Sequence, residues 1–233
     1  MAEASKKEMI RVMFDDISPK YDFLNHFLSF GIDRIWRKKL VSILGTRKPI
    51  AVLDVATGTG DLAIAISALK PQKIVGIDIS EKMLDIGRKK LPSLGLNQLI
   101  TFRCADAEKI PFSDNTFDAI TVAFGVRNFE NLELGLTEMR RVLRPGGLML
   151  ILEFSHPGSF PMKQLYSLYS RFFIPLMGKL ISGSNQAYSY LPESVAAFPS
   201  GNNFLEILGK QELKNVRLVN LSMGIASIYL AEK

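Results

Sequence analysis

The sequence has few residues of the types that bind metals or form cross-links: one cysteine and two histidines among 233 residues. The single thiol, Cys104, cannot form an internal disulfide, which favours a reducing, cytoplasmic location. With only His26 and His156 beside it, no closed zinc site can be assembled, so no metal is expected.

Long apolar runs are also lacking. No stretch reaches the roughly 20 apolar residues that cross a bilayer, and the first eleven residues are polar instead of forming an apolar signal core. We therefore expect a cytoplasmic protein, either soluble or peripheral to the inner membrane. The net charge of +6 is a small excess, with lysine and arginine scattered along the chain. Nucleic acid is therefore not an expected partner.

Two common catalytic signatures are missing as well. The chain has no Gly-x-Ser-x-Gly elbow of a serine hydrolase and no Gly-Lys-Ser/Thr of a phosphate-binding loop. What it does contain is the segment 52–61, in which an apolar run ends in a glycine turn and a helical pattern follows. This arrangement lets the backbone approach a nucleotide-like ligand closely.

Acidic residues close three successive apolar runs. They are Asp54, Asp78 and Asp106. Because the carboxyl ends of parallel strands share one edge of a sheet, we expect these acids to line one crevice. Three carboxylates fit a ligand with hydroxyl and amino groups, and they fit a pyrophosphate poorly.

The chain alternates strand and helix patterns, which predicts a parallel sheet with helices on both faces. Strands are predicted near residues 50–55, 73–78, 100–104, 117–123, 147–154, 215–221 and 225–231, and helices near 35–45, 60–69, 81–91, 131–142 and 202–209. Only three residues separate the last two strands, which allows an antiparallel hairpin and excludes a helical crossover. The prediction is an α/β protein with seven strands, the last one antiparallel.

Residues 155–201 interrupt this alternation. Between Ser159 and Ser184 the segment is rich in aromatic and aliphatic residues with three basic residues among them, and its helical pattern is interrupted at Pro175. It predicts a helical lid, about residues 156–201, that lines an apolar pocket. The alternative is an amphipathic surface that contacts a membrane.

Several segments resemble motifs of class I S-adenosylmethionine-dependent methyltransferases: residues 54–60, Asp78, residues 105–112 followed by 117–118, and residues 141–147. Residues 21–25, 29–32, 36–37, 124–128 and 152–155 are similar to a narrower group, the ubiquinone/menaquinone C-methyltransferase family. The resemblance spans nearly the whole chain. It implies one Rossmann-like domain, residues 1–233, with an N-terminal helical cap at about residues 8–45.

The same resemblance implies S-adenosyl-L-methionine as the cofactor and assigns the glycine turn to it. Gly58 and Gly60 permit a turn that a Cβ atom would obstruct. Thr59, at the start of a helix, is expected to donate to the cofactor carboxylate, or to cap the helix. Asp54 either contacts the methionine ammonium or braces the loop from within.

The remaining cofactor contacts are expected further along the sheet edge. Asp78 should accept hydrogen bonds from the ribose hydroxyls and Asp106 from the adenine amine, with the Ala107 backbone beside the adenine ring. Ala123 stands where related sequences often carry serine, so backbone groups would replace that hydroxyl. The chain also departs from the family pattern at His26 and Asp33, where the family often has an acidic or small residue and a histidine.

The family methylates a ring carbon of a polyprenylated quinol, and the resemblance implies the same reaction here. The carbon becomes nucleophilic when a ring hydroxyl loses its proton, so the reduced quinol is the expected acceptor. Arg127 is the predicted stabiliser of the phenolate, Asn128 would fix a water, and Tyr21 would close over the crevice. A plain ion-paired loop is the alternative for Arg127 and Asn128. The general base, the head group, membrane contact and assembly into a homo-oligomer are left open.

Two other functions are compatible with the sequence. One is methylation of a different apolar or phenolic small molecule, such as a sterol or an oxygen acceptor. The other is a nicotinamide-dependent oxidoreductase, because Gly58, Gly60 and Ala63 match its loose glycine fingerprint. The acids at positions 54 and 106 and the terminal hairpin argue against the second alternative.

Overall fold

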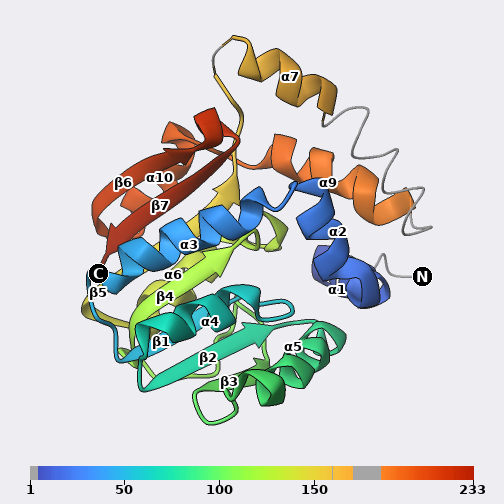
Figure 1. Cartoon of the computed structure of the whole chain (residues 1–233). Helices are drawn as coiled ribbons and strands as arrows, with labels where there is room; N and C mark the ends of the chain where they lie inside the picture. Colours follow the sequence, from blue (N-terminus) through green and yellow to red (C-terminus); the bar gives the residue numbers. More distant parts are fainter. Residues whose placement is uncertain (1–4, 159, 170–184) are drawn as a thin grey trace.

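The structure is a computed structural model that describes residues 5–158, 160–169 and 185–233. Its centre is one sheet of seven strands in the order β3-β2-β1-β4-β5-β7-β6 (Figure 1). The strands are β1 (Ala51–Val55), β2 (Lys73–Asp78), β3 (Ile100–Cys104), β4 (Phe117–Ala123), β5 (Leu143–Phe154), β6 (Lys214–Leu221) and β7 (Ala226–Glu232). β7 runs antiparallel to both of its neighbours, and every other pairing is parallel. The predicted sheet is confirmed.

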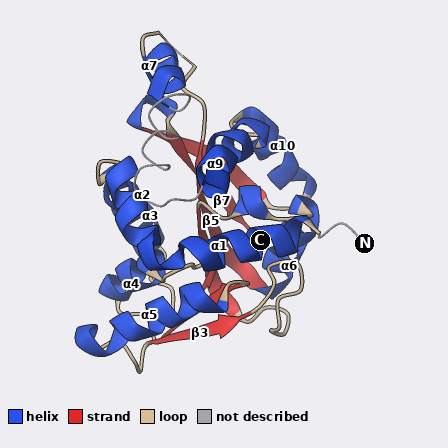
Figure 2. Ribbon diagram, turned by 90° about the vertical axis from the view of Figure 1, so that its right-hand side faces the viewer, coloured by secondary structure: helices blue, strands red, loops and turns tan. Residues whose placement is uncertain are grey.

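Helices cover both faces of the sheet (Figure 2). In the described part of the chain the α-helices are α1 (Lys6–Ile17), α2 (Tyr21–Leu28), α3 (Ile32–Gly45), α4 (Asp61–Ile66), α5 (Glu81–Leu94), α6 (Leu132–Val142), α7 (Met162–Leu168), α9 (Asn185–Ala197) and α10 (Asn202–Lys210). The apolar sides of α3, α4 and α5 pack on one face, and those of α6 and α10 on the other. Burial on both faces explains why β1, β4 and β5 read as nearly continuous apolar runs.

The predicted strand boundary that differs most is the start of β5. β5 begins at Leu143, four residues before the predicted start, because Leu143 pairs with Phe117 and the next paired residue is Leu148. The intervening residues, with Gly146 at φ +75°, form the irregularity between these pairs. In the lid region α7 and α9 are helical, whereas the predicted break at Pro175 lies outside the described residues. None of the described helices is long and apolar enough to span a bilayer.

The strand order reverses between β1 and β4, and the loops that follow these strands meet at the carboxyl edge of the sheet. Their approach is close: a Cβ added to Gly125 would lie 2.5 Å from the Cβ of Ala56. Ala56 and Phe124 both hold positive φ angles, of 51° and 60°. Such angles cost a residue with a side chain roughly 1–2 kcal/mol, so the surrounding packing must hold this edge in place.

The N-terminal helices α1 and α2 fold back over this edge, where α9 joins them (Figure 1). Ser5 caps α1 by accepting a hydrogen bond from the Glu8 backbone N–H at 3.2 Å. Ile10, Met13 and Ile17 then pack with Met83 of α5 in a small cluster of their own. This helix begins at Lys6, two residues before the start of the helical cap expected at about residue 8.

Asp54 joins β1, β4 and the glycine turn from inside the sheet. The residue is 1% exposed, and its two carboxylate oxygens accept hydrogen bonds from the hydroxyls of Thr57 and Thr121 at 2.6 and 2.7 Å. Burial raises the pKa of Asp54 to about 6, although both hydroxyls oppose the shift. Of the two roles considered for Asp54, contact with the methionine ammonium and an internal brace of the loop, these hydrogen bonds favour the brace.

This burial makes a testable prediction about stability and pH. A carboxyl whose pKa is raised on folding favours the folded state at low pH, and that contribution is lost as pH rises through the folded pKa. Relative to Asp54→Asn, the wild-type protein should therefore lose up to about 3 kcal/mol of unfolding free energy between pH 4 and 7. Denaturant titrations of both proteins across this range measure the difference. Parallel pH profiles would contradict the assignment.

Candidate active site

Two cavities adjoin at the carboxyl edge of the sheet and share Phe14, Tyr21 and Phe124 as a common wall. The smaller, of about 80 Å³, lies against the glycine turn and is called the cofactor-side cavity here. The larger, of about 680 Å³, lies among α2, α3, α7 and α9 and is called the aromatic cavity. Its described lining includes Trp36, Phe154, Tyr166, Tyr169, Tyr190 and Leu191.

The two glycines of the turn are required for different reasons. Gly58 has a φ of +56° and donates its backbone N–H to the Asp78 carboxylate at 2.8 Å. Gly60 has a φ of +82°, and a Cβ there would lie 2.3 Å from the Phe102 ring. Gly58 lines the cofactor-side cavity, whereas Gly60 packs behind it.

Asp78, at the end of β2, presents its carboxylate to the cofactor-side cavity. Burial raises its pKa, while backbone N–H groups of Ser80, Gly58 and Ile79 counteract the shift. Each carboxylate oxygen already accepts one backbone N–H, Ser80 at 2.9 Å and Gly58 at 2.8 Å. A carboxylate has about four acceptor positions, so Asp78 can still accept from a ligand.

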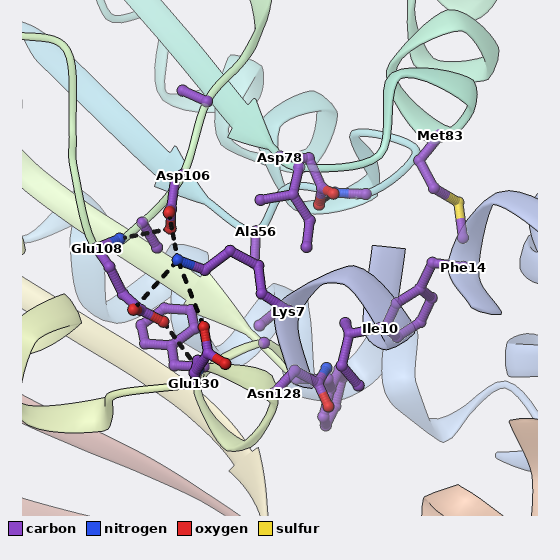
Figure 3. Close-up of a pocket in the computed structure, with 18 of the residues that line it drawn as sticks. Lys7, Ile10, Phe14, Ala56, Asp78, Met83, Asp106, Glu108, Asn128 and Glu130 are labelled. Carbon is purple, nitrogen blue, oxygen red and sulfur yellow. Dashed lines mark hydrogen bonds and ion pairs between the residues drawn. The ribbon is translucent and has the colours of Figure 1, made fainter. Parts of the chain in front are cut away.

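A lysine that the sequence reading missed reaches the far end of the same cavity (Figure 3). Lys7, on α1, places its ammonium 2.6 Å from the Asp106 carboxylate, 3.4 Å from Glu108 and 3.8 Å from Glu130. The hydrogen bond to Asp106 raises the pKa of Lys7 above its ordinary value. Any ligand amine that hydrogen-bonds Asp106 must therefore share that carboxylate with Lys7 or displace it.

The other predicted cofactor residues divide into two groups. Ala107 and Ala123 line the cofactor-side cavity with Gly58, Asp78 and Asp106. Asp54, Thr59 and Gly60 lie outside its lining. The Thr59 hydroxyl donates to Asp22 on α2, and the residue is only 2% exposed. This contact ties the glycine turn to the N-terminal helices.

A chain of polar contacts continues from that point. Lys90 lies 2.6 Å from Asp22 and 2.8 Å from Asp61, the first residue of α4. His26 in turn lies between the carboxylates of Asp61 and Asp33, at 3.4 and 2.9 Å. The two departures from the family pattern, His26 and Asp33, thus occur at contacting positions.

Arg127 lines the aromatic cavity and pairs with Glu153, a residue at 0% exposure inside β5. The guanidinium lies 2.8 Å from the Glu153 carboxylate and also donates to the Phe124 carbonyl and the Ser194 hydroxyl. Burial raises the pKa of Glu153, against the opposing charge of Arg127. Removal of either partner would leave an uncompensated buried charge, typically at a cost of about 3–5 kcal/mol.

The three residues predicted for catalysis come together around the common wall. Tyr21 borders both cavities, Arg127 borders the aromatic cavity and Asn128 borders the cofactor-side cavity. Burial raises the pKa of the Tyr21 hydroxyl, while the charges of Arg127 and Arg37 lower it. The Asn128 side chain accepts a hydrogen bond from Tyr190 at 3.1 Å. These three side chains therefore face the same region from two elements, α2 and the short helical turn Val126–Asn128.

Sequence reasoning also missed the partner of Arg127, although a signal for it existed. Glu153 is a charged residue inside the otherwise apolar run Leu148–Phe154. A buried strand tolerates such a residue only when an opposite charge meets it. For Lys7 no comparable signal exists, because its partners lie about 100 residues away in sequence.

Comparison with solved structures supports the fold. A methyltransferase from Thermotoga maritima described as SAM-dependent superimposes with a TM-score of 0.64 at 19% identity, over 95% of this chain and 98% of that one. The [4+2]-cyclase SpnF superimposes with a TM-score of 0.61 at 18% identity, over 100% of this chain and 97% of the other. Since a cyclase shares the architecture, the fold alone does not specify the reaction.

Comparison with sequences is more specific. A demethylmenaquinone methyltransferase from Bacteroides fragilis is 48% identical over 232 residues, 99% of this chain and 95% of the relative. A ubiquinone/menaquinone biosynthesis C-methyltransferase from Geobacter sulfurreducens is 46% identical over 98% of this chain and 90% of the relative.

The sequence profile of the ubiE/COQ5 methyltransferase family matches residues 2–233. The family resemblance seen in the motifs is confirmed, and the oxidoreductase alternative is excluded by it. The chain is a methyltransferase and belongs to the ubiE/COQ5 methyltransferase family.

Proposed function

We propose that the protein transfers a methyl group from S-adenosyl-L-methionine to a ring carbon of a polyprenylated quinol in menaquinone or ubiquinone synthesis. The observation that carries the proposal is the common wall of the two cavities: Phe14, Tyr21 and Phe124 border both. A donor in one cavity and a ring in the other would meet there, and holding two reactants in line supplies much of the rate of such a transfer. The names of the full-length relatives support the same reaction.

The cofactor-side cavity suits an adenosyl group in its chemistry. Asp78 offers carboxylate acceptors for ribose hydroxyls, and Asp106 offers one for the adenine amine. Ile79 and Met83 supply apolar wall on the same side. When bound, S-adenosylmethionine supplies an electrophilic methyl group and leaves as S-adenosylhomocysteine. Asp54, on this account, holds the turn in place from beneath and does not touch the ligand.

The aromatic cavity suits a large apolar acceptor. Its volume of about 680 Å³ and its tyrosine, phenylalanine and tryptophan walls fit a fused or substituted ring that carries an isoprenoid chain. Arg127 is a charged residue in this lining. Its ion pair with the buried Glu153 holds its guanidinium in a fixed position. A fixed guanidinium is well suited to stabilise negative charge that develops on a ring oxygen.

In a 1,4-diol, each oxygen donates electron density to the ring carbon that is ortho to the carbon bearing it. The ring loses one hydroxyl proton, gains the methyl group on the neighbouring carbon and then loses the proton of that carbon. The hydroxyl is then restored, so one proton is released overall. We propose that Arg127 stabilises the phenolate, that Asn128 positions a water and that Tyr21 separates the reacting groups from solvent.

We further propose that residues 1–233 form one domain in which α1–α3 are a cap and residues 156–201 a lid. Contact with a membrane surface is supported by two exposed aromatic residues: Phe23 in α2 is 60% exposed, and Phe30, in the turn that follows α2, is 69% exposed. Such a contact would let the aromatic cavity receive a prenylated ring from the bilayer. Self-assembly stays a further proposal, tested by light scattering.

Asp78→Ala tests the cofactor side. Removing a carboxylate that accepts from two hydroxyls should lower the affinity for S-adenosylhomocysteine by more than about tenfold. Calorimetric titration measures this, with Asp85→Ala as the control because Asp85 is an exposed acid on α5 that does not line the cavity. Affinity within about twofold of the wild-type value would place the ribose elsewhere.

Arg127 is best tested together with its partner, because Arg127→Ala alone leaves Glu153 buried and unpaired. The double variant Arg127→Gln with Glu153→Gln removes both charges and should keep the fold. We expect turnover of a reduced quinol to fall at least ~100-fold, the scale of one lost electrostatic stabiliser, with S-adenosylhomocysteine affinity unchanged. Turnover similar to that of Glu153→Gln alone would remove Arg127 from the mechanism.

The proposed reaction is tested with methyl-labelled S-adenosylmethionine and chemically reduced demethylated naphthoquinols and benzoquinols. We expect label on at least one reduced quinol and none on the oxidised quinones. Oxidation of the product separates the outcomes, because a C-methylated quinol oxidises to a quinone and an O-methyl ether does not. The proposal would be rejected if the label remained on an ether, or if label were transferred when the acceptor is supplied as the oxidised quinone.

A further inference from the structure

The helix α1 forms one wall of the cofactor-side cavity. Lys7, Ile10 and Phe14 belong to this wall, whereas Gly58 and Asp78 line the cavity from the edge of the sheet. The enclosed volume is about 80 Å³. Cavities that hold drug-sized ligands typically measure about 300–1,000 Å³. A whole adenosyl cofactor therefore needs more room than this position of α1 allows.

This helix is attached to the domain less firmly than the strand ends. Its buried residues Ile10, Met13 and Ile17 belong to a small cluster that is separate from the two clusters on the faces of the sheet. Elements with few buried apolar contacts open at a lower free-energy cost than core elements. Near the C-terminal end of α1, Asp15 accepts from the Ser80 hydroxyl at 2.6 Å, and the chain continues into α2. The first turn, at the other end, is therefore the part that can move away.

Two lysines fasten the first turn of α1. Lys6 donates to the Phe129 carbonyl at 2.5 Å, and the Lys7 ammonium lies 2.6, 3.4 and 3.8 Å from three carboxylates (Figure 3). A positive charge in the first turn of a helix is unfavourable, because it meets the positive end of the helix dipole. Tertiary contacts compensate for both lysines, and these contacts attach α1 to the loops after β3 and β4.

The three carboxylates differ in how firmly they are held. The Glu108 side chain is 8% exposed, and its Oε1 accepts from the backbone N–H groups of Glu130 and Asn131 at 2.8 and 3.1 Å. Its Oε2 is the atom that lies 3.4 Å from the Lys7 ammonium. The side chains of Asp106 and Glu130 are more accessible, at 31% and 38%. Glu108 is thus a fixed partner that Lys7 keeps when Asp106 accepts from another donor.

We propose that Lys7 is a latch on α1, which opens to admit the cofactor and closes again over the bound adenosyl group. When the adenine amine reaches Asp106, the Lys7 ammonium shifts toward Glu108 and Glu130 and keeps α1 in place. Lys7 is a positioning residue in this account, because it acts through α1 and does not touch the transferred methyl group. The inference rests on the proposed cofactor site and is independent of the acceptor.

A latch, a ligand contact and a competitor affect binding kinetics differently. A latch slows both entry and exit, so its loss raises the association and the dissociation rate constants together. A direct contact with the cofactor slows exit alone, and a competitor for Asp106 slows entry alone. S-adenosylhomocysteine is the probe, because it binds without transferring a methyl group. Surface plasmon resonance on the immobilised full-length protein measures both rate constants.

Lys7→Met removes the ammonium and keeps an unbranched side chain of similar length. Both rate constants should rise about three- to tenfold, the scale of a partly exposed ion-pair network, and the equilibrium affinity should change less than either rate. Lys7→Arg keeps the charge and should hold both constants within about twofold of the wild-type values. The control is Lys89→Met, which removes one positive charge from an exposed position on α5 and should change neither constant.

A rise in only one rate constant, or in neither, would overturn the proposal. Salt gives a second measurement that needs no variant: it screens partly exposed ion pairs, so both wild-type constants should rise between low and high ionic strength. If Lys7→Met does not fold, as its melting curve would show, wild-type constants that stay the same across this range would overturn the proposal. Failure of the proposed function gives a different result: S-adenosylhomocysteine would not bind the wild-type protein, or it would bind with latch kinetics while no quinol is methylated.

Discussion

The contact between the N-terminal helices and the edge of the sheet is the constraint on which the site depends. Without α1 and α2, the loops after β1 and β4 would face solvent, and there would be no common wall. Tyr21 and Phe14 come from these helices, and Phe124 comes from the sheet edge. The Thr59–Asp22 hydrogen bond and the ion pairs of Lys90 fasten the helices to the glycine turn. The same contacts therefore position the walls of both the cofactor-side cavity and the aromatic cavity.

Local strain and buried charge are concentrated at that same edge. Phe124 holds a left-handed backbone conformation, and Glu153 and Asp54 lie fully inside the protein. Each is unfavourable by itself, and each has a specific compensation: two threonine hydroxyls for Asp54, and Arg127 with two backbone N–H groups for Glu153. Groups that are costly in this way persist where they fix the orientation of functional side chains.

The sequence predicts the framework of this protein well, and its tertiary contacts poorly. Apolar periodicity and turn residues locate all seven strands, because burial on both faces of the sheet produces a strong local pattern. The glycine turn and the acids at strand ends locate the cofactor-side cavity, because they also are local features of the sequence. What periodicity cannot give is which carboxylates turn inward: Asp54 is held by Thr121, 67 residues away, and Asp106 meets Lys7, 99 residues away. The helical cap at the start of the chain is expected from the family resemblance, but the local sequence does not give which of its side chains reach the site.

The central claim is that donor and acceptor occupy neighbouring cavities and meet at the wall formed by Phe14, Tyr21 and Phe124. A crystal structure of the ternary complex with S-adenosylhomocysteine and a short-chain quinol tests it most directly. The account predicts the nucleoside against Asp78 and the quinol ring among the aromatic residues, with the sulfur and the unsubstituted ring carbon facing each other beside Tyr21. A ring bound outside the aromatic cavity, or a nucleoside bound away from Asp78, would contradict it.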